Sequence, residues 1–485
     1  MTLVTNPQAL LAIASSPVDH MPKRLVLCLD GTWANTYDEK KRRDGHTVLK
    51  PANPLKLCRA VVPFDDVTGR RQIAYYHIGV GGLAMYPGLS NSLLQRADRI
   101  LGGGWGAGFE ENVEGALHFL VLNFESEDDV FIFGFSRGAA TARAVTRFLE
   151  WNHGLPEKED AYYLPRLFRA FVLSHGGADV QERELAAINA DRQHEKRPLA
   201  PLKPFRQVRV KYLGVWDTVM ALGSRFQATA ASTSSSARTF YAGTRPASCV
   251  ERARQALAID ERRFDFRPEI WTDSLVHQTM EQRWFAGVHS NVGGGYVNDG
   301  LANIAFHWIL EGAVDRGLKI DPAFVSFYRP FSYDSLYESY SWLYRTLDVL
   351  RGRADAGQRN LVGLPPGANA DVDRSVIARI QAEPLDLSRG SDNKVVTKPY
   401  RPENVLLFLA RQSDLGAYLE AIGVPDGKTI PLPDDVKRRI AELKKPGELS
   451  GTPPRERASD SSDGDLPTSD AGVREQVVKP VLRND

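Results

Sequence analysis

Ser136 is the residue whose surroundings most clearly favour covalent chemistry. It stands in the pentapeptide GFSRG at 134–138, between the apolar run Val130–Phe133 and a series of alanines that begins at Ala139. The β-branched and aromatic run predicts a buried strand, and the alanines predict a helix. A serine in such a turn, with glycines two positions before and after it, is typical of a nucleophile presented to solvent. Because the pentapeptide also occurs by chance, the flanking elements carry the prediction.

A carboxylate and a histidine, the two residue types that would activate a serine, each follow another predicted strand. Asp217 closes the apolar run 210–216, and His289 follows the run 282–288 and precedes three glycines. A carboxylate at the end of a core strand is costly to bury unless a group such as a histidine pairs with it. Alternatively, Asp217 caps the following turn and His289 is structural. The order Ser136, Asp217, His289 is the chain order of α/β-hydrolase triads and favours the catalytic interpretation.

The motif CLDGTWAN contains a third polar group, Asp30, at the end of another predicted strand. In a serine hydrolase, the backbone N–H of Gly31 or Thr32 would form an oxyanion hole together with the backbone N–H of Arg137. Asp30 could equally cap a turn. Asp-Gly-Thr after an apolar strand is also typical of haloacid-dehalogenase phosphatases, whose nucleophilic aspartate stands two positions earlier. Here that position is Cys28, which makes a phosphatase the weaker alternative.

The pattern of apolar runs predicts an α/β fold with a mainly parallel sheet and helices on both faces. Sites in such sheets lie beyond the carboxyl ends of the strands, where this chain places its polar motifs. We expect strands at Arg24–Asp30, Gln72–Val80, Val130–Phe135, Val208–Asp217 and Gln282–Val288, and helices at about 109–123, 138–150 and 301–315.

Composition narrows the classes of protein. The chain has 485 residues, 42% of them hydrophobic, and a formal net charge of +1, so nothing favours nucleic acid as a partner. Three scattered cysteines predict neither a disulfide framework nor a zinc site and fit a reducing compartment. We expect no cofactor and no metal. The sequence encodes no Sec signal and no apolar segment of membrane-spanning length, so we expect a soluble, cytoplasmic protein.

We divide the chain into an N-terminal extension (1–22), a catalytic domain (23–317), a C-terminal cap or helical region (318–445) and a disordered tail (446–485). The aromatic cluster Phe324–Tyr344 would meet a lipid interface or pack on the core. The glycine-rich segments GVGG and GGGWGAG lack the spacing of phosphate-binding loops and are interpreted as turns. The segment QATAASTSSSART is interpreted as a mobile surface loop.

Together these motifs resemble one bacterial and fungal domain family, which includes the catalytic domain of the family-one type VI secretion phospholipase effectors. The resemblance covers about residues 23–317. It implies an α/β-hydrolase fold, a Ser-Asp-His esterase site at Ser136, Asp217 and His289, and a phospholipid substrate. The recurrence of IDERRF in the family pattern suggests that Asp260 or Arg263 makes a fixed ion pair near the site. The motifs that carry the resemblance are LCLDGTWAN, YYHIGVGG, GGGWGAGFEENVEGAL, GFSRGAATARAV, YLGVWDTV, ALAIDERRFDFRPEIW and WFAGVHSNVGGGYVNDGLANIAFHWIL.

This sequence departs from the family pattern at two places. Asn291 stands where the family often has an aspartate, and Ala34 separates DGTW from the asparagine that usually follows it. Neither departure touches the three residues of the expected triad.

The expected reaction is ester hydrolysis through an acyl-enzyme, with phospholipid or another lipid as substrate and peripheral contact with a membrane surface. Three alternatives stay open: a carboxylesterase acting on soluble esters, a phosphatase centred on Asp30, and a hydrolase-fold binding protein without catalysis. If the protein is an effector, the resemblance also implies export by a type VI system and a secretion-apparatus or immunity partner.

Overall fold

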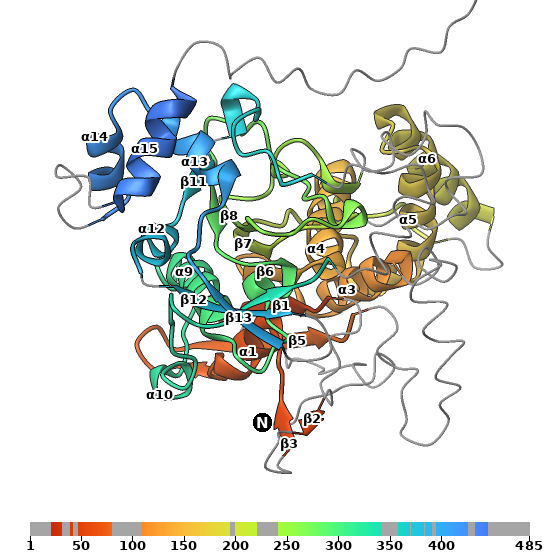
Figure 1. Cartoon of the computed structure of the whole chain (residues 1–485). Helices are drawn as coiled ribbons and strands as arrows, with labels where there is room; N and C mark the ends of the chain where they lie inside the picture. Colours follow the sequence, from red (N-terminus) through yellow and green to blue (C-terminus); the bar gives the residue numbers. More distant parts are fainter. Residues whose placement is uncertain are drawn as a thin grey trace, which may run out of the picture.

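The computed structural model describes residues 21–31, 39–41, 47–79, 109–194, 199–220, 241–340, 357–368, 370–382, 384–389, 394–424 and 432–444. Their centre is an eight-stranded sheet in the order β11-β9-β8-β7-β6-β1-β5-β4 (Figure 1). All neighbouring strands are parallel except β4 and β5. The strands are β1 (Arg24–Leu29), β4 (Phe64–Asp65), β5 (Arg70–His77), β6 (Asp129–Phe135), β7 (Val210–Trp216), β8 (Arg252–Ala258), β9 (Thr279–Phe285) and β11 (Ala370–Val372).

Helices cover both faces of this sheet, because its central strands are apolar on both sides. Along β1, Leu25 and Leu27 belong to one buried cluster, while Val26 and Cys28 belong to the cluster on the opposite face. Such alternation between two covered faces is expected of a strand in the centre of a parallel sheet. The first face carries α3 (Phe109–Asn123), α4 (Arg137–Trp151) and α5 (Leu164–Leu173), and the second carries α1 (Asn53–Ala60), α9 (Gly300–Val314) and α10 (Pro322–Val325).

The chain beyond 317 contains strands as well as helices. Strand β11 extends the main sheet at β9, and β10 (Leu336–Glu338), β12 (Leu385–Arg389) and β13 (Lys394–Lys398) form a separate three-stranded sheet. A third buried cluster joins β8 and β9 to helices that gather at one side of the sheet, whereas α6 (Ala178–His194) lies at the other side (Figure 1). These helices are α12 (Arg374–Gln381), α13 (Glu403–Ala410), α14 (Leu415–Ala421) and α15 (Asp434–Leu443).

The expected α/β architecture with a mostly parallel sheet is confirmed, and each predicted strand and helix is present with ends shifted by a few residues. The description of 318–445 as helical was incomplete, because it missed the three-stranded sheet and β11. The division at Gly317 stays a prediction. The N-terminal extension up to residue 20, both glycine-rich segments for the most part, the QATAASTSSSART segment and the tail lie outside the described residues.

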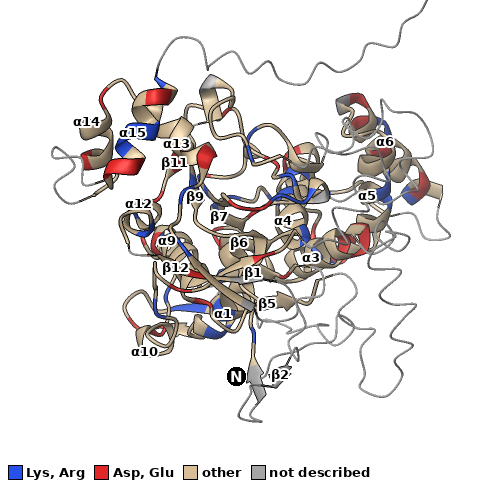
Figure 2. Ribbon diagram, viewed as in Figure 1, with Lys and Arg blue, Asp and Glu red and all other residues tan. Residues whose placement is uncertain are grey.

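Charged side chains of both signs are interspersed along the ribbon, as on α15 (Figure 2). Within the described ranges, no helix is both long and apolar enough to cross a membrane.

Candidate active site

Ser136 occupies the expected sharp turn between β6 and α4. Its backbone has a φ of 58°, a left-handed conformation that is strained for a residue with a side chain. The flanking glycines are required by space: a Cβ at Gly134 would lie 2.3 Å from the carbonyl oxygen of Gly138, and one at Gly138 would lie 2.2 Å from that of Leu29. The Ser136 side chain is only 7% exposed. The expectation that it faces solvent was therefore wrong, because neighbouring strand ends such as Gly31 close in around it.

Asp217 and His289 lie together at the carboxyl ends of β7 and β9. His289 begins the short helix α8 (His289–Gly293), and its Nδ1 is 2.6 Å from Oδ2 of Asp217. Both side chains are buried. The His289 Nε2 atom is also buried, and none of the described residues offers it a hydrogen bond.

The segment around Ser136 packs directly against the His289 helix. The ring of Phe135 lies 4.6 Å from the imidazole, and a Cβ at Gly293 would lie 1.9 Å from the same phenylalanine ring. Phe266 meets the imidazole edge to face, with 5.0 Å between the ring centroids. The imidazole thus contacts two aromatic rings, with Nδ1 on Asp217 and with Nε2 lacking a partner among the described residues. No hydrogen bond joins Ser136 to Nε2 in the described part of the chain.

Arg359 is a fourth residue at this position that the sequence analysis missed. Its guanidinium donates to both carboxylate oxygens of Asp217, at 2.5 Å to Oδ1 and 3.0 Å to Oδ2. It also donates to the carbonyl oxygens of Ala258 and Phe266, at 2.7 and 2.6 Å. The backbone N–H of Ala258 donates to Oδ1 as well. Asp217 therefore accepts from an arginine, a histidine and the backbone, rather than from the histidine alone.

These contacts determine the charge states of the pair. Burial by itself raises the pKa of Asp217, but the charge of Arg359 and the hydrogen bond to His289 outweigh it, so that the pKa lies below its ordinary value. Burial lowers the pKa of His289, and Asp217 opposes this effect only in part. At neutral pH the site thus holds an ionised aspartate and a neutral imidazole, which is the state of a general base.

Glu261 is hydrogen-bonded to the first residue of the His289 helix. This fully buried carboxylate accepts the backbone N–H of His289 at 3.2 Å and two hydrogen bonds from the guanidinium of Arg263, each 2.9 Å long. The prediction of a fixed ion pair near the site is therefore confirmed for Arg263, with Glu261 as its partner. Of the two residues named, Asp260 has other partners: it accepts from the Gly287 N–H and from the hydroxyl of Tyr400 in the C-terminal region.

Asn291, where the family often has an aspartate, has a role that a neutral side chain can fill. Its amide oxygen accepts the backbone N–H groups of Val288 and Tyr337, and its Nδ2 donates to the carbonyl of Ser335. The amide thus ties α8 to β10 without any charge. The other departure, at Ala34, lies outside the described residues.

Two of the three expected oxyanion donors, Arg137 and Gly31, lie in the described residues. Arg137 is the first residue of α4, and the first N–H groups of a helix have no acceptor within it. The N–H of Gly31 already donates to Oδ1 of Asp30 at 3.0 Å, so it would have to share this hydrogen bond with an oxyanion. Thr32 lies outside the described residues. Asp30 itself is buried, and its Oδ2 accepts the hydroxyl of Tyr76 at 2.7 Å.

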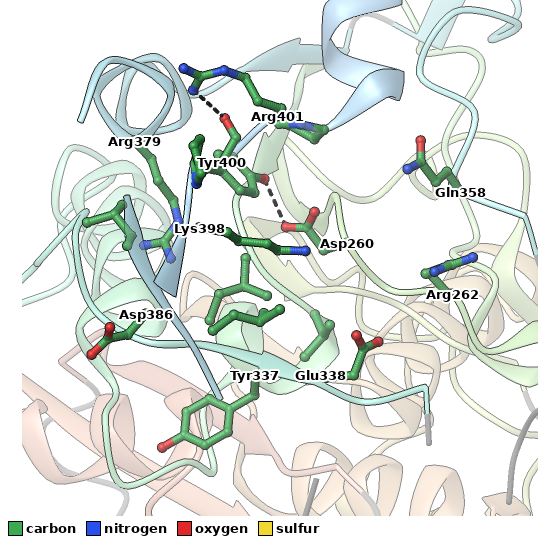
Figure 3. Close-up of a pocket in the computed structure, with 16 residues that line it drawn as sticks. Asp260, Arg262, Tyr337, Glu338, Gln358, Arg379, Asp386, Lys398, Tyr400 and Arg401 are labelled. Carbon is green, nitrogen blue, oxygen red and sulfur yellow. Dashed lines mark hydrogen bonds between the residues drawn. The ribbon is translucent and has the colours of Figure 1, made fainter. Parts of the chain in front are cut away.

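Two cavities are lined by residues other than Ser136, Asp217 and His289. One, of about 170 Å³, lies behind Val288, where Tyr400 points toward Asp260 (Figure 3). The other, of about 630 Å³, lies between α9 and α12 and is lined by Trp308 and Arg283 among others. Across the described ranges, no group of three or more His, Cys, Asp or Glu residues is placed to hold a metal ion.

The fold and these strand-end residues define the class: an α/β protein whose polar groups gather beyond the carboxyl ends of a parallel sheet. Residues 23–312, more than half of the chain, match the family described as T6SS, Phospholipase effector Tle1-like, catalytic domain. The chain belongs to this family, and the resemblance found in its motifs is confirmed.

Individual relatives are distant. The Saccharomyces cerevisiae protein named "Uncharacterized protein YEL023C" is 23% identical over 253 residues, which are 52% of this chain and 33% of that protein. An uncharacterized protein from Pseudomonas aeruginosa is 18% identical, with 87% of this chain and 62% of that chain covered and a TM-score of 0.36. The Tle1 effector bound to the VgrG spike from the Type 6 secretion system is 18% identical, with 57% and 51% covered and a TM-score of 0.28. The chain spans about a third of the yeast relative and less than two thirds of either structure.

Proposed function

We propose that the protein is a serine ester hydrolase of the α/β-hydrolase type that cleaves phospholipids, with Ser136 as nucleophile, His289 as base and Asp217 as the carboxylate that orients the base. One observation carries the proposal: a buried imidazole is bonded to Asp217 through Nδ1 and has an unpartnered Nε2, while a serine in a strained turn belongs to the segment packed against it. A neutral imidazole whose second nitrogen is held by a carboxylate is the arrangement that activates a serine hydroxyl.

In the proposed reaction, Nε2 of His289 takes the proton of Ser136 as the serine oxygen attacks the ester carbonyl. Asp217 keeps the imidazole in the tautomer whose proton is on Nδ1 and stabilises the imidazolium that forms. The N–H of Arg137, with a second donor from the loop after β1, stabilises the oxyanion. The alcohol leaves with the proton from His289, and a water molecule then hydrolyses the acyl-enzyme by the same route in reverse.

Membership in a phospholipase effector family supports a phospholipid substrate. A lipid hydrolase must take its substrate from an aggregate, which requires exposed apolar side chains near the site. The described part of the predicted aromatic cluster offers three: Phe327, Phe331 and Tyr333 are 80%, 52% and 46% exposed. Tyr337 stacks on Tyr296 at 4.0 Å instead, and Trp342 lies outside the described residues. Family membership also leads us to propose export by a type VI system, with a secretion-apparatus protein as partner.

Labelling with a fluorophosphonate tests the mechanism. We expect the wild-type protein to be labelled and to cleave ester substrates, and Ser136→Ala to lose both properties while its Tm changes little, because the substitution removes one hydroxyl. Ester hydrolysis retained in Ser136→Ala would contradict the serine mechanism. If Asp30→Asn instead lost a Mg²⁺-dependent phosphatase activity that Ser136→Ala kept, the phosphatase alternative would replace it.

The substrate class needs a separate measurement. We expect Phe327→Ser and Tyr333→Ser to lower hydrolysis of long-chain phospholipid vesicles severalfold and to leave short-chain aryl ester hydrolysis intact. Leu173→Ser is the matched control, since Leu173 is 70% exposed on α5, away from the cluster. A soluble-ester hydrolase would cleave the short-chain aryl ester and leave the phospholipid vesicles intact, and a parallel loss on both substrates would mean that the aromatic side chains stabilise the fold.

A further inference from the structure

Arg359 lies beyond the part of the chain that matches the family, yet its guanidinium contacts both carboxylate oxygens of Asp217. The matched residues end at 312, and Arg359 comes from the C-terminal region. Asn404 at the start of α13 fixes this segment through two hydrogen bonds: its Nδ2 donates to the carbonyl of Arg359 at 3.1 Å, and its backbone N–H donates to Oε1 of Gln358 at 3.2 Å. The guanidinium thus reaches Asp217 from a backbone that α13 holds in place.

We infer that Arg359 is a positioning residue of the site, which fixes Asp217 against His289 and withdraws part of the aspartate's negative charge from the imidazole. The inference rests on the proposed function of these residues. The inference follows from two features of the contact. Two parallel hydrogen bonds from an arginine fix the plane of a carboxylate. In addition, Oδ2 of Asp217 accepts hydrogen bonds from both Arg359 and His289.

The electrostatic consequence has a definite sign. A carboxylate that is shared with a buried guanidinium stabilises an adjacent imidazolium less than a carboxylate that faces the histidine alone. Among the residues that the structure describes, the other charged groups that act on His289 are Glu261, which would stabilise the imidazolium, and Arg263, which opposes it and is bonded to Glu261. These two charges offset each other, whereas Arg359 acts on the imidazole through Oδ2 of Asp217, which it shares with His289. Loss of Arg359 should raise the pKa of His289 and keep the base protonated to higher pH.

Removal of an arginine with a purely structural role would leave the pKa of His289 unchanged. Arg379 is such an arginine and serves as the control. Arg379 is equally buried, comes from the same region of the chain and donates to the carbonyl oxygens of Ser332 and Asp334. Its guanidinium lies over the ring of Tyr400. Among the described contacts, none joins Arg379 to Asp217 or His289, so its removal should lower stability alone.

The test is the titration of His289 in the full chain, followed by imidazole NMR resonances that are assigned through their loss in His289→Gln. We expect Arg359→Gln to raise the titration midpoint by about one pH unit. The acid limb of kcat/KM on a short-chain ester should move by the same amount, which lowers kcat/KM at the wild-type midpoint by roughly fivefold. Arg359→Lys, which keeps the charge without the fork, should give a smaller shift, and Arg379→Met should give none.

An unchanged midpoint in Arg359→Gln, or an equal shift in Arg379→Met, would overturn the inference. If Arg359→Gln does not fold, the comparison of Arg359→Lys with Arg379→Met decides in its place. The NMR midpoints do not depend on activity. A wild-type protein that resists fluorophosphonate labelling would therefore defeat the proposed function, whereas the midpoints would still decide whether Arg359 controls the charge of the Asp217–His289 pair.

Discussion

Asp30 and Asp217 occupy equivalent places in the fold and differ in their partners. Each follows a parallel strand of the central sheet, and each side chain is buried. Asp217 is bonded to the guanidinium of Arg359 and to His289, whereas Asp30 is bonded to two neutral groups, the N–H of Gly31 and the hydroxyl of Tyr76. Burial raises the pKa of Asp30 to about 7, while the pKa of Asp217 lies below its ordinary value.

The difference shows that the position at a strand end does not determine the charge of a carboxylate. Neutral donors offset only part of the desolvation of an ionised carboxylate, whereas a guanidinium supplies both hydrogen bonds and the opposite charge. At neutral pH, Asp217 is therefore an ionised acceptor for a histidine, and Asp30 carries a proton for much of the time. The first state suits the orientation of a base, and the second suits a group that supports a neighbouring loop.

The largest effect is expected from Asp217→Asn. An amide there would favour the wrong tautomer of His289 and leave Arg359 without a counter-charge, so we expect kcat to fall by roughly 10³–10⁴. Loss of one partner of a buried ion pair should also lower the free energy of unfolding by about 3–5 kcal/mol at pH 7. Steady-state kinetics and urea denaturation measure the two effects.

Asp128→Asn is the control for this variant. Asp128 is also buried and is paired with Lys23, but it lies just before β6, at the end of the sheet opposite the site. Its substitution should lower stability and leave kcat unchanged. If both variants lost activity in proportion to stability, Asp217 would be a structural carboxylate only.

The sequence predicts a residue of this site only where the residues directly before it indicate its place in the fold. Ser136, Asp217 and His289 each follow directly on an apolar run, so their common edge of the sheet could be predicted from strand ends alone. Arg359 could not, because it stands 142 residues after Asp217 in a segment without strand or helix periodicity. The only available signal was that a buried aspartate needs a counter-charge, and His289 alone was taken to satisfy it.

Strand β8 (Arg252–Ala258) is a part of the central sheet that the sequence analysis missed. It reads RARQALA and carries two arginines. In the structure both arginines bond to Glu281 on the neighbouring β9, so the charges are paired across the sheet and do not interrupt it. Cross-strand pairing of this kind is invisible until the neighbours are known.

Asp30→Asn should have a smaller effect on activity than Asp217→Asn. We expect kcat to fall by at most about tenfold, since the change weakens one or two hydrogen bonds near the loop after β1. A larger fall than in Asp217→Asn would contradict the assignment of the two carboxylates and revive the phosphatase alternative.

The stability of Asp30→Asn should depend on pH in a defined direction. Because the folded-state pKa of Asp30 is raised from 3.8 to about 7, the folded protein binds more protons than the unfolded chain between these values, and wild-type stability declines as the pH rises through this window. Asp30→Asn removes this decline. Its Tm relative to wild type should therefore increase by a few degrees from about pH 4 to about pH 8. A constant difference in Tm would mean that Asp30 is ionised throughout.

The smallest effect is expected from Tyr76→Phe, which tests whether the neutral donor matters at all. The hydroxyl of Tyr76 donates to Oδ2 of Asp30 at 2.7 Å, and this hydrogen bond lowers the pKa of Asp30 against the larger effect of burial. Without it, the pKa of Asp30 should rise further, and the free energy of unfolding should fall by about 1 kcal/mol.

Tyr75→Phe is a close control, because the Tyr75 hydroxyl is buried and accepts or donates no hydrogen bond among the described residues. Carboxyl ¹³C NMR of Asp30 in the two variants measures the difference: the midpoint should move upward in Tyr76→Phe and stay in place in Tyr75→Phe. Equal midpoints would show that burial alone sets the charge of Asp30, and that the contrast with Asp217 arises entirely from Arg359 and His289.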